Sequence, residues 1–277
     1  MQADADSREP TLGVGLAGLG AVGRTVLEAL EVGLPGYHLA GIAVRREERA
    51  RAFLDEVGTQ AKLLDLDALV DASDIVVEAL PPTLFRQLAT RVVDQGKELV
   101  VLSIGALLEH WDLVEAAERS GARILVPSGA ILGLDAVQAA AQGEIHSITM
   151  ITRKPTKGLA GAPFLDGREV DITTITEPLQ LFEGTAREAI TGFPANLNVA
   201  VALSLVGLGP DRTRLEVWAD PALERNTHHV EVESDSARLQ FSIENIPTEE
   251  NPRTGRITAL SIVALLRKRT ASLAIGT

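Results

Sequence analysis

Short apolar segments alternate with amphipathic ones along the first half of the chain. The apolar segments have the length and composition of buried strands, and they cover residues 12–17, 38–44, 74–79, 99–104 and 123–126. The segments between them have the spacing or composition of helices, at residues 24–32, 47–57, 84–95 and 107–120. Strands separated by helices of this length indicate an α/β fold, with a doubly wound parallel sheet and helices on both faces.

The pattern changes from Ile145 onward. Alternating apolar and polar residues predict strands at 147–152, 214–219, 228–233 and 238–244. The stretch 168–183 is polar and β-rich, and helices are predicted at 185–191, 196–205 and 257–266. This mixture predicts a second, α+β domain with a mostly antiparallel sheet.

A glycine-rich segment, Gly18-Leu19-Gly20-Ala21-Val22-Gly23, closes the first strand and opens the first helix. In this context the three glycines are typical of a Rossmann-type dinucleotide-binding turn. Gly18 permits the tight turn, Gly20 leaves room for a pyrophosphate, and Gly23 lets helix and strand pack closely. The first helical residues, Ala21 and Val22, offer main-chain N–H groups to the phosphates. The alternative is a glycine-rich turn that binds nothing.

The end of the second strand bears on which dinucleotide is bound. Enzymes that prefer NAD usually carry Asp or Glu there, on the ribose hydroxyls. This chain has Val44-Arg45-Arg46, and its acids follow only at Glu47 and Glu48. A guanidinium group suits a 2′-phosphate, so Arg45 and Arg46 predict that NADP binds at least as well as NAD. The alternative is that both arginines are solvated loop charges.

These patterns together predict the domain organisation. We expect a flexible tail at residues 1–10, a Rossmann domain at 11–132 completed by the C-terminal segment 251–277, and an α+β substrate and dimerisation domain at 133–250. The length of 277 residues agrees with about two domains.

Composition excludes several classes of function. The 26 basic and 38 acidic residues give a net charge of −12, which argues against binding of nucleic acid or anionic membranes. The absence of cysteine excludes disulfides, thiolate metal sites and cysteine nucleophiles. No His, Asp and Glu residues have the spacing of a metal site. The longest apolar stretch, 199–208, is too short to span a bilayer, and the N-terminus does not look like an export signal. We therefore expect a cytoplasmic protein.

Histidine is the scarce residue that suits acid–base chemistry near neutral pH. Of the five, His38, His110 and His146 have the placement of surface or linker residues. Strand periodicity separates the remaining pair: His228 shares a face with two valines and points inward, whereas His229 shares a face with two glutamates and points outward. From spacing alone, His228 is either a satisfied core histidine or an acid–base group in a cleft.

Motifs along nearly the whole chain after the tail resemble those of the L-aspartate dehydrogenase family. Besides the glycine-rich turn, they are Val76-Val77-Glu78-Ala79, Ser103-Ile104-Gly105-Ala106-Leu107, Pro127-Ser128-Gly129-Ala130-Ile131, Thr152-Arg153-Lys154-Pro155, Phe193-Pro194-Ala195-Asn196-Leu197-Asn198-Val199-Ala200, Ala219-Asp220-Pro221 with Asn226-Thr227-His228, and Asn251-Pro252-Arg253-Thr254. The chain differs from the family pattern at His229, where an acidic residue is usual, and at Gly255, where serine is frequent.

The resemblance implies roles for particular residues. Ala130 would contact the cofactor through its backbone near the nicotinamide, the amide of Asn196 would also contact the cofactor, and His228 would be the catalytic histidine. The dicarboxylate substrate needs cations, for which Arg153 and Lys154 are candidates; both could instead be solvated surface charges.

The resemblance also implies a reaction. L-aspartate would pass a hydride from Cα to NAD or NADP and give iminosuccinate, which water converts to oxaloacetate and ammonia; the reverse is reductive amination. The alternatives are a related NAD(P)H-dependent imine reductase, an amino-acid dehydrogenase for another substrate, a different Rossmann oxidoreductase, or a protein that only senses nucleotides. We expect a homodimer formed through the sheet of the second domain, and a link to NAD biosynthesis.

Overall fold

The computed structural model describes residues 11–168, 170–194, 197–249, 251 and 254–277. The expected tail at residues 1–10 lies outside the described residues, as does Asn196. The chain forms two compact units, Met1–Pro127 with Ile262–Ala274 and Ser128–Ser261 with Ile275–Thr277. The division falls within the last helix, α11 (Arg256–Thr270).

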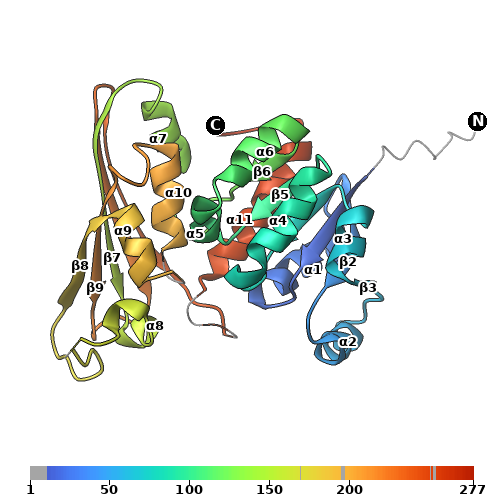
Figure 1. Cartoon of the computed structure of the whole chain (residues 1–277), viewed down its shortest axis with the longest axis horizontal. Helices are drawn as coiled ribbons and strands as arrows, with labels where there is room; N and C mark the ends of the chain where they lie inside the picture. Colours follow the sequence, from blue (N-terminus) through green and yellow to red (C-terminus); the bar gives the residue numbers. More distant parts are fainter. Residues whose placement is uncertain (1–10, 169, 195–196, 250, 252–253) are drawn as a thin grey trace, which may run out of the picture. The chain divides into compact units, whose positions relative to one another are not determined.

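The first unit is built on a six-stranded sheet in the order β3-β2-β1-β4-β5-β6 (Figure 1). All five strand pairings are parallel, which confirms the predicted doubly wound α/β fold. The strands are β1 (Leu12–Ala17), β2 (Tyr37–Ala43), β3 (Leu63–Leu64), β4 (Ile75–Glu78), β5 (Glu98–Val101) and β6 (Arg123–Leu125).

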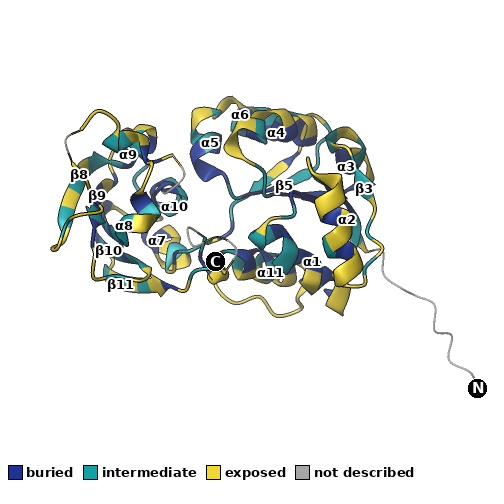
Figure 2. Cartoon of the chain, turned by 90° about the horizontal axis from the view of Figure 1, so that it is seen from below, coloured by how far each residue is buried: buried dark blue, intermediate teal, exposed yellow. Residues whose placement is uncertain are grey.

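Helices cover this sheet because its strands bury apolar side chains on both faces. Val14 and Leu16 of β1 lie in one core with Val26 and Leu27 of the first helix, and Leu266 of α11 belongs to the same core (Figure 2). The helices are α1 (Ala21–Gly33), α2 (Glu47–Glu56), α3 (Leu66–Ala72), α4 (Phe85–Asp94), α5 (Ile104–Glu109) and α6 (Asp112–Ser120), with a short 3-10 helix η1 (Pro82–Leu84) before α4.

The second unit contains a five-stranded sheet in the order β11-β10-β7-β9-β8. The β7–β9 pairing is parallel and the other three are antiparallel, so the sheet is mixed and mostly antiparallel, as predicted. Its strands are β7 (Ile145–Lys154), β8 (Leu179–Thr185), β9 (Arg214–Ala219), β10 (Asn226–Ser234) and β11 (Arg238–Asn245).

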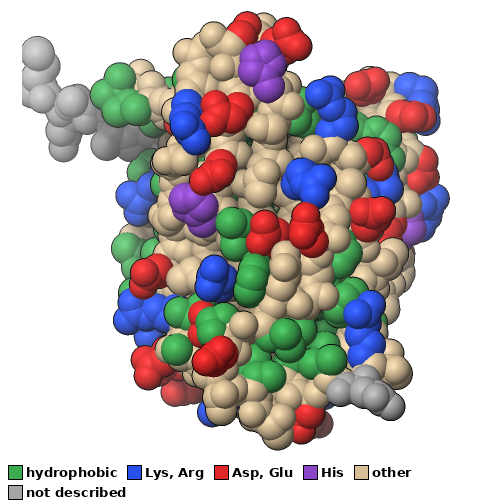
Figure 3. Space-filling model, turned by 90° about the vertical axis from the view of Figure 1, so that its left-hand side faces the viewer, with side chains coloured by type: hydrophobic (Ala, Val, Ile, Leu, Met, Phe, Trp, Pro, Cys, Tyr) green, Lys and Arg blue, Asp and Glu red, His purple; other side chains and the backbone are tan. Residues whose placement is uncertain are grey.

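One face of this sheet packs under helices. Ile148, Met150 and Val217 of the sheet share a core with Val137 and Leu203 of the covering helices. These helices are α7 (Leu134–Ala140), α9 (Ala186–Gly192) and α10 (Asn198–Val206); α8 (Thr156–Leu159) and the 3-10 helix η2 (Pro163–Leu165) follow β7. Figure 3 views the unit from the other side of the sheet, where charged side chains of both signs surround a group of hydrophobic ones.

Two predicted elements differ from the structure for local reasons. The predicted strand 99–104 ends at Val101, because the Glu78 carboxylate accepts the N–H groups of Leu102 and Ser103 and so ends the ladder. The predicted helix 107–120 is two helices, α5 and α6. They break at His110, whose ring stacks on Phe85 with the centroids 6.4 Å apart.

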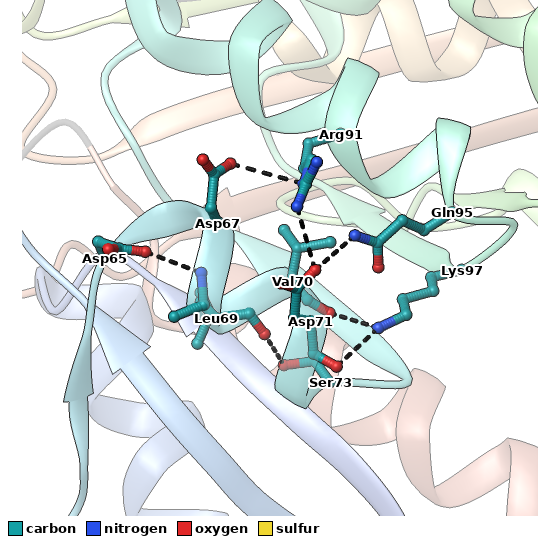
Figure 4. Close-up of polar contacts among 10 residues, drawn as sticks. Asp65, Asp67, Leu69, Val70, Asp71, Ser73, Arg91, Gln95 and Lys97 are labelled. Atoms are coloured by element: carbon teal, nitrogen blue, oxygen red, sulfur yellow. Dashed lines mark hydrogen bonds and ion pairs between the residues drawn. The ribbon is translucent and has the colours of Figure 1, made fainter.

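Helix α3, of seven residues, was not predicted from the sequence. Polar contacts hold it in place (Figure 4). The side chain of Asp65 caps its N-terminus by accepting the N–H of Ala68 at 2.8 Å. Lys97 donates to the carbonyls of Val70 and Asp71 at its C-terminus, where a cation also complements the helix dipole.

Candidate functional site

The glycine-rich turn between β1 and α1 has the geometry that its sequence predicts. Gly18 has a φ of +108°, and a Cβ there would meet the carbonyl oxygen of Ala79. A Cβ on Gly23 would meet the carbonyl of Gly18. By contrast, no atom lies within 4 Å of the position that a Cβ of Gly20 would take. Two glycines are thus required by packing, and the third borders open space.

The start of α1 presents unpaired N–H groups at this open space. No side chain caps the helix at Gly20, and the first N–H groups of a helix, here those of Ala21, Val22 and Gly23, have no partner inside it. The positive end of the helix dipole lies at the same place. The space beside Gly20 and these donors together fit a pyrophosphate.

β2 ends at Ala43, and Arg45 and Arg46 follow it after the single residue Val44. Both are exposed, and within the described ranges neither side chain forms an ion pair or hydrogen bond. The nearby Glu47 is engaged with Arg51 at 3.3 Å. Two cations are therefore available at the position where dinucleotide-binding enzymes carry the residue that distinguishes NAD from NADP.

Glu78 is a buried acid at the end of β4, next to this turn. Its carboxylate accepts hydrogen bonds from the N–H groups of Leu80, Leu102 and Ser103 and from the Ser103 hydroxyl. Burial raises its pKa, and these bonds oppose that effect. Three of these bonds connect the end of β4 with the residues that follow β5, and the fourth, from Leu80, is local, so Glu78 has a structural role in the fold.

In the second unit, the predicted orientation of His228 is confirmed. His228, Val230 and Val232 of β10 are buried on the helix-covered face. His229 lies on the opposite face, where its ring contacts Ser242 at 2.7 Å and Glu231 at 3.2 Å.

His228 has two polar neighbours on the adjacent strand β7. It is in register with Thr152, and the Thr152 hydroxyl lies 2.9 Å from His228 Nδ1. The second neighbour is Lys154. Burial, and next the charge of Lys154, lower the pKa of His228 from 6.5 to about 3. The imidazole is therefore neutral at pH 7, and one of its two ring nitrogens carries no hydrogen.

Lys154 and Arg153 lie on opposite faces of β7. Lys154 is 4% exposed, and burial lowers its pKa to about 8, so it remains largely charged at pH 7. Arg153 lies outside, with its guanidinium 4.9 Å from the Trp218 ring centroid and 3.9 Å from Asp220. The sheet thus brings only Lys154 to the face that carries His228.

The side chains of Thr152, Lys154 and His228 form a row on this face, which we call the His228 row. A cavity of about 520 Å³ opens within the second unit, and its lining includes Pro155, which follows Lys154 in the sequence. Asn226, which precedes His228 by two residues on the same face, lines it opposite its register partner Asn245. The charged residues Lys157, Glu224 and Arg225 also line it. The lining thus holds two cations, one carboxylate and three amides, the third being that of Asn251, and this mixture suits a ligand that carries both carboxylate and amino groups.

Sequence reasoning gave no role to Thr152, Lys157, Arg225 or Asn245. Thr152 belongs to the Thr152-Arg153-Lys154-Pro155 motif, and its position directly before two basic residues was the available signal. Asn245 has no local signal, because only the register of β10 and β11 brings it opposite Asn226.

Ala130 lies in the turn after β6, in the second unit. Its carbonyl accepts a hydrogen bond from Asn245 Nδ2 at 3.0 Å. In the described part of the chain, no three His, Asp or Glu side chains are grouped so as to hold a metal ion. Among the described residues, no helix is both long enough and apolar enough to cross a membrane.

Comparisons with known proteins agree with both halves of this description. Residues 135–269 match the family model described as aspartate dehydrogenase, C-terminal, and residues 18–127 match the model described as homoserine dehydrogenase, NAD binding domain. The L-aspartate dehydrogenase of Bradyrhizobium diazoefficiens is 54% identical over 266 residues, covering 96% of this chain and 94% of that protein. The chain belongs to the L-aspartate dehydrogenase family.

Other members of the L-aspartate dehydrogenase family match along the same length. L-aspartate dehydrogenase 3 of Bordetella bronchiseptica is 51% identical and covers 98% of this chain and 99% of its own. Among solved structures, aspartate dehydrogenase of Thermotoga maritima superposes with a TM-score of 0.72 at 24% identity, covering 96% of this chain and 99% of its own. Scyllo-inositol dehydrogenase of Lactobacillus casei superposes with a TM-score of 0.54 at 16% identity, covering 96% and 91%. Both solved structures support the fold.

Proposed function

We propose that the chain is an NAD(P)-dependent L-aspartate dehydrogenase. In this reaction the Cα–H bond of L-aspartate breaks, its hydride passes to the oxidised cofactor, and the amino group loses protons to give iminosuccinate. Water then converts iminosuccinate to oxaloacetate and ammonia. The observation that carries the proposal is the buried, neutral His228 beside Lys154, in a chain 54% identical to a protein named L-aspartate dehydrogenase.

The glycine-rich turn of the first unit is the proposed site for the pyrophosphate of the cofactor. Gly18, Gly20, Ala21, Val22 and Gly23 surround the space that fits its pyrophosphate. Ala130 and Asn196 are the contacts that the family resemblance implies near the nicotinamide. When bound, the nicotinamide supplies the hydride acceptor, and the chain's own residues bind and orient the reactants.

His228 is the proposed acid–base group. The α-ammonium of aspartate must lose a proton before its nitrogen lone pair can assist departure of the hydride. A neutral imidazole can accept that proton through Nε2 if Nδ1 carries the ring hydrogen. In the proposed tautomer the Thr152 hydroxyl oxygen, 2.9 Å from Nδ1, accepts the Nδ1–H bond.

Lys154 is the proposed partner for a substrate carboxylate. Burial strengthens its attraction for an anion because little water screens the charge. Lys157 and Arg225 of the cavity are candidates for the second carboxylate of aspartate, since neither forms an ion pair within the described ranges. Arg153 is the weaker candidate, because Trp218 and Asp220 already engage it.

The arginines after β2 favour NADP. We propose that Arg45 and Arg46 bind the 2′-phosphate, so that NADP is used at least as well as NAD. Replacing both with Ala should raise the KM for NADP about tenfold or more and change the KM for NAD little. Equal changes for both cofactors would mean that the two arginines are solvated loop charges.

Assembly, location and pathway complete the proposal. Trp218 and Ile151, on the outer face of the second unit's sheet, are half-buried. Figure 3 shows hydrophobic side chains among charged ones on that side, and we propose that a homodimer forms there. The absence of cysteine suits a reducing cytoplasm, and iminosuccinate could enter NAD biosynthesis. A related imine reductase or amino-acid dehydrogenase with another substrate is the alternative function.

The test is initial-rate nicotinamide absorbance in both directions. One assay contains L-aspartate with NAD⁺ or NADP⁺, and the other contains oxaloacetate and ammonia with NADH or NADPH; D-aspartate, L-asparagine and L-glutamate serve as substrate controls. Turnover confined to L-aspartate and its oxaloacetate counterpart is expected. Cofactor binding without aspartate turnover, together with turnover of another amino or imino acid, would favour the alternative.

A further inference from the structure

Arg24, at the start of α1, is a half-buried cation without a carboxylate partner. Among the described arginines only Arg153 is likewise half-buried rather than exposed, and Arg153 has Asp220 beside it at 3.9 Å. Arg24 forms no ion pair with any residue that the structure describes, although the chain carries 38 acidic residues. Because less water screens a half-buried charge, Arg24 attracts an anion more strongly than a solvated arginine does.

Two contacts hold the guanidinium group of Arg24. Its Nε donates to the carbonyl of Leu19 at 3.4 Å, and its Cζ lies 4.0 Å from the centroid of the Phe53 ring, in a cation–π contact. These contacts use one N–H group and one face of the planar group. The two terminal nitrogens have no hydrogen-bond partner among the described residues. They leave a fork of N–H donors, which is the geometry that suits a phosphate.

Both contacts place Arg24 beside the proposed dinucleotide site of the first unit. Leu19 directly precedes Gly20 in the glycine-rich turn. Phe53 belongs to α2, and Arg46 is the residue immediately before this helix. Helical residues seven apart share a face, so Phe53 lies on the face of Arg46, and its ring points back toward the helix start. The guanidinium of Arg24 therefore lies between the turn and the start of α2, where the adenosine ribose of a bound dinucleotide is expected.

We propose that Arg24 binds the 2′-phosphate of NADP, in addition to the loop arginines, and that Phe53 is a positioning residue that holds the Arg24 guanidinium for this contact. The inference rests on the proposed function, which brings a dinucleotide to the glycine-rich turn. A phosphate monoester carries about two negative charges and three acceptor oxygens at neutral pH, so it can bind several arginines at once.

Arg24 differs from the loop arginines in how its donors are held. Arg45 and Arg46 are exposed and have no described partner, so a ligand must order their side chains when it binds. The contacts of Arg24 with Leu19 and Phe53 order its side chain beforehand. Since a preorganised group loses less conformational entropy on binding, we expect Arg24 to contribute at least as much to NADP affinity as either loop arginine.

The experiment measures the binding of NADP⁺ and NAD⁺, which differ only in the 2′-phosphate, to the purified full-length chain. Arg24→Ala should weaken NADP⁺ binding about tenfold or more, the factor for a lost charge-assisted hydrogen bond, and change NAD⁺ binding less than about twofold. Adenosine 2′,5′-bisphosphate should lose the same factor as NADP⁺, whereas 5′-AMP should not. Arg119→Ala removes an exposed, unpaired arginine of the described part of α6, and this control should alter none of the four affinities.

Two further variants separate charge, shape and position. Arg24→Lys keeps a cation but lacks the planar fork, so it should show part of the loss, and it replaces Arg24→Ala if that variant folds poorly. Phe53→Leu removes the ring face and should weaken NADP⁺ binding about threefold with NAD⁺ binding unchanged. Phe53→Tyr keeps the ring and should bind NADP⁺ like the unmodified chain. A merely structural role of Phe53 would lower both affinities together.

Equal weakening of NADP⁺ and NAD⁺ in folded Arg24 variants would overturn the inference, because Arg24 would then support the turn or contact the shared pyrophosphate. Unchanged NADP⁺ binding would overturn it as well, and so would an unmodified chain that binds adenosine 2′,5′-bisphosphate no more tightly than 5′-AMP. None of these results depends on turnover. A chain whose Arg24 variants behave as expected but which does not oxidise L-aspartate would contradict the proposed function and leave this inference standing.

Discussion

The glycine-rich turn of the first unit and the His228 row of the second are built in opposite ways. The turn is six consecutive residues, and its ligand would meet main-chain N–H groups and empty space. The row consists of side chains on separate strands, with Thr152 and His228 76 residues apart in sequence. One site is specified by local backbone conformation and the other by strand register.

This difference sets what each site tolerates. At the turn, an added methyl group changes the backbone path, because a Cβ on Gly18 or Gly23 would meet a main-chain carbonyl. In the row, a side chain can be exchanged without changing the sheet, because its neighbours on the strand still pack. Substitutions in the glycine-rich turn should therefore change either the stability of the chain or its affinity for the cofactor. Substitutions in the His228 row should mainly change kcat.

The largest effect is expected at His228. Replacing it with Gln keeps a polar side chain but removes the base, and kcat for L-aspartate should fall about a thousandfold, within the range of lost acid–base catalysis. Cofactor affinity should stay within about twofold, because the glycine-rich turn is untouched. The measurement is steady-state kinetics with a parallel cofactor titration.

The neighbouring histidine provides the control for this change. His229→Gln alters the outward face, where Ser242 and Glu231 contact the ring, and its turnover should remain close to that of the unmodified chain. If both variants lost activity alike, or if His228→Gln remained active, acid–base chemistry would have to be assigned to another residue.

The second prediction distinguishes Gly18 from Gly20, which lie in the same turn but should affect stability differently. Gly18→Ala forces a Cβ onto a backbone with a φ of +108° and against the Ala79 carbonyl, and it should lower the free energy of unfolding by about 3 kcal/mol. Gly20→Ala meets no atom within 4 Å, so stability should change by less than about 0.5 kcal/mol. Its methyl group instead occupies the proposed pyrophosphate space, and cofactor affinity should fall.

Urea unfolding and cofactor titration of both variants check this separation. A destabilised Gly20→Ala chain would mean that packing also requires the middle glycine. A Gly20→Ala chain with normal cofactor affinity would mean that the pyrophosphate lies elsewhere.

The same contrast explains how much could be predicted from the sequence. The glycine-rich turn, the doubly wound parallel sheet and the inward side of His228 follow from local patterns, and the structure agrees with them. The bond from Asn245 to Ala130 joins residues 115 positions apart, and the opposite faces of Arg153 and Lys154 matter only once Trp218 and Asp220 are placed. Such pairs depend on register and tertiary packing, which a single sequence does not display.

The third prediction concerns the stability of the folded chain at acidic pH. The pKa of His228 is about 3 in the folded chain and 6.5 as an ordinary histidine. Between these values the unfolded chain binds a proton that the folded chain does not, so stability falls as the pH is lowered through this window. The contribution of this one group from pH 7 to pH 5 is about 2 kcal/mol.

His228→Gln removes this contribution, so its free energy of unfolding should fall less steeply with acid than that of the unmodified chain. Urea titrations at several pH values, with His229→Gln as the control, measure the difference. Parallel curves for all three proteins would mean that His228 is protonated inside the folded chain at mild acidity, through access to water that its burial does not suggest.

The smallest effect tests the proposed tautomer. Thr152→Val keeps the shape of a fully buried side chain and removes the hydroxyl 2.9 Å from His228 Nδ1. Without that acceptor the neutral ring has no reason to keep its hydrogen on Nδ1, and the tautomer with a free Nε2 becomes less populated. We expect kcat to fall about tenfold with little change in the KM for the cofactor, since one modest hydrogen bond is lost. Thr149→Val, on the same strand but the opposite face, is the matched control. A loss of kcat in Thr152→Val alone would tie the row's chemistry to register, whereas equal kcat values in both variants would mean that His228 acts without help from β7.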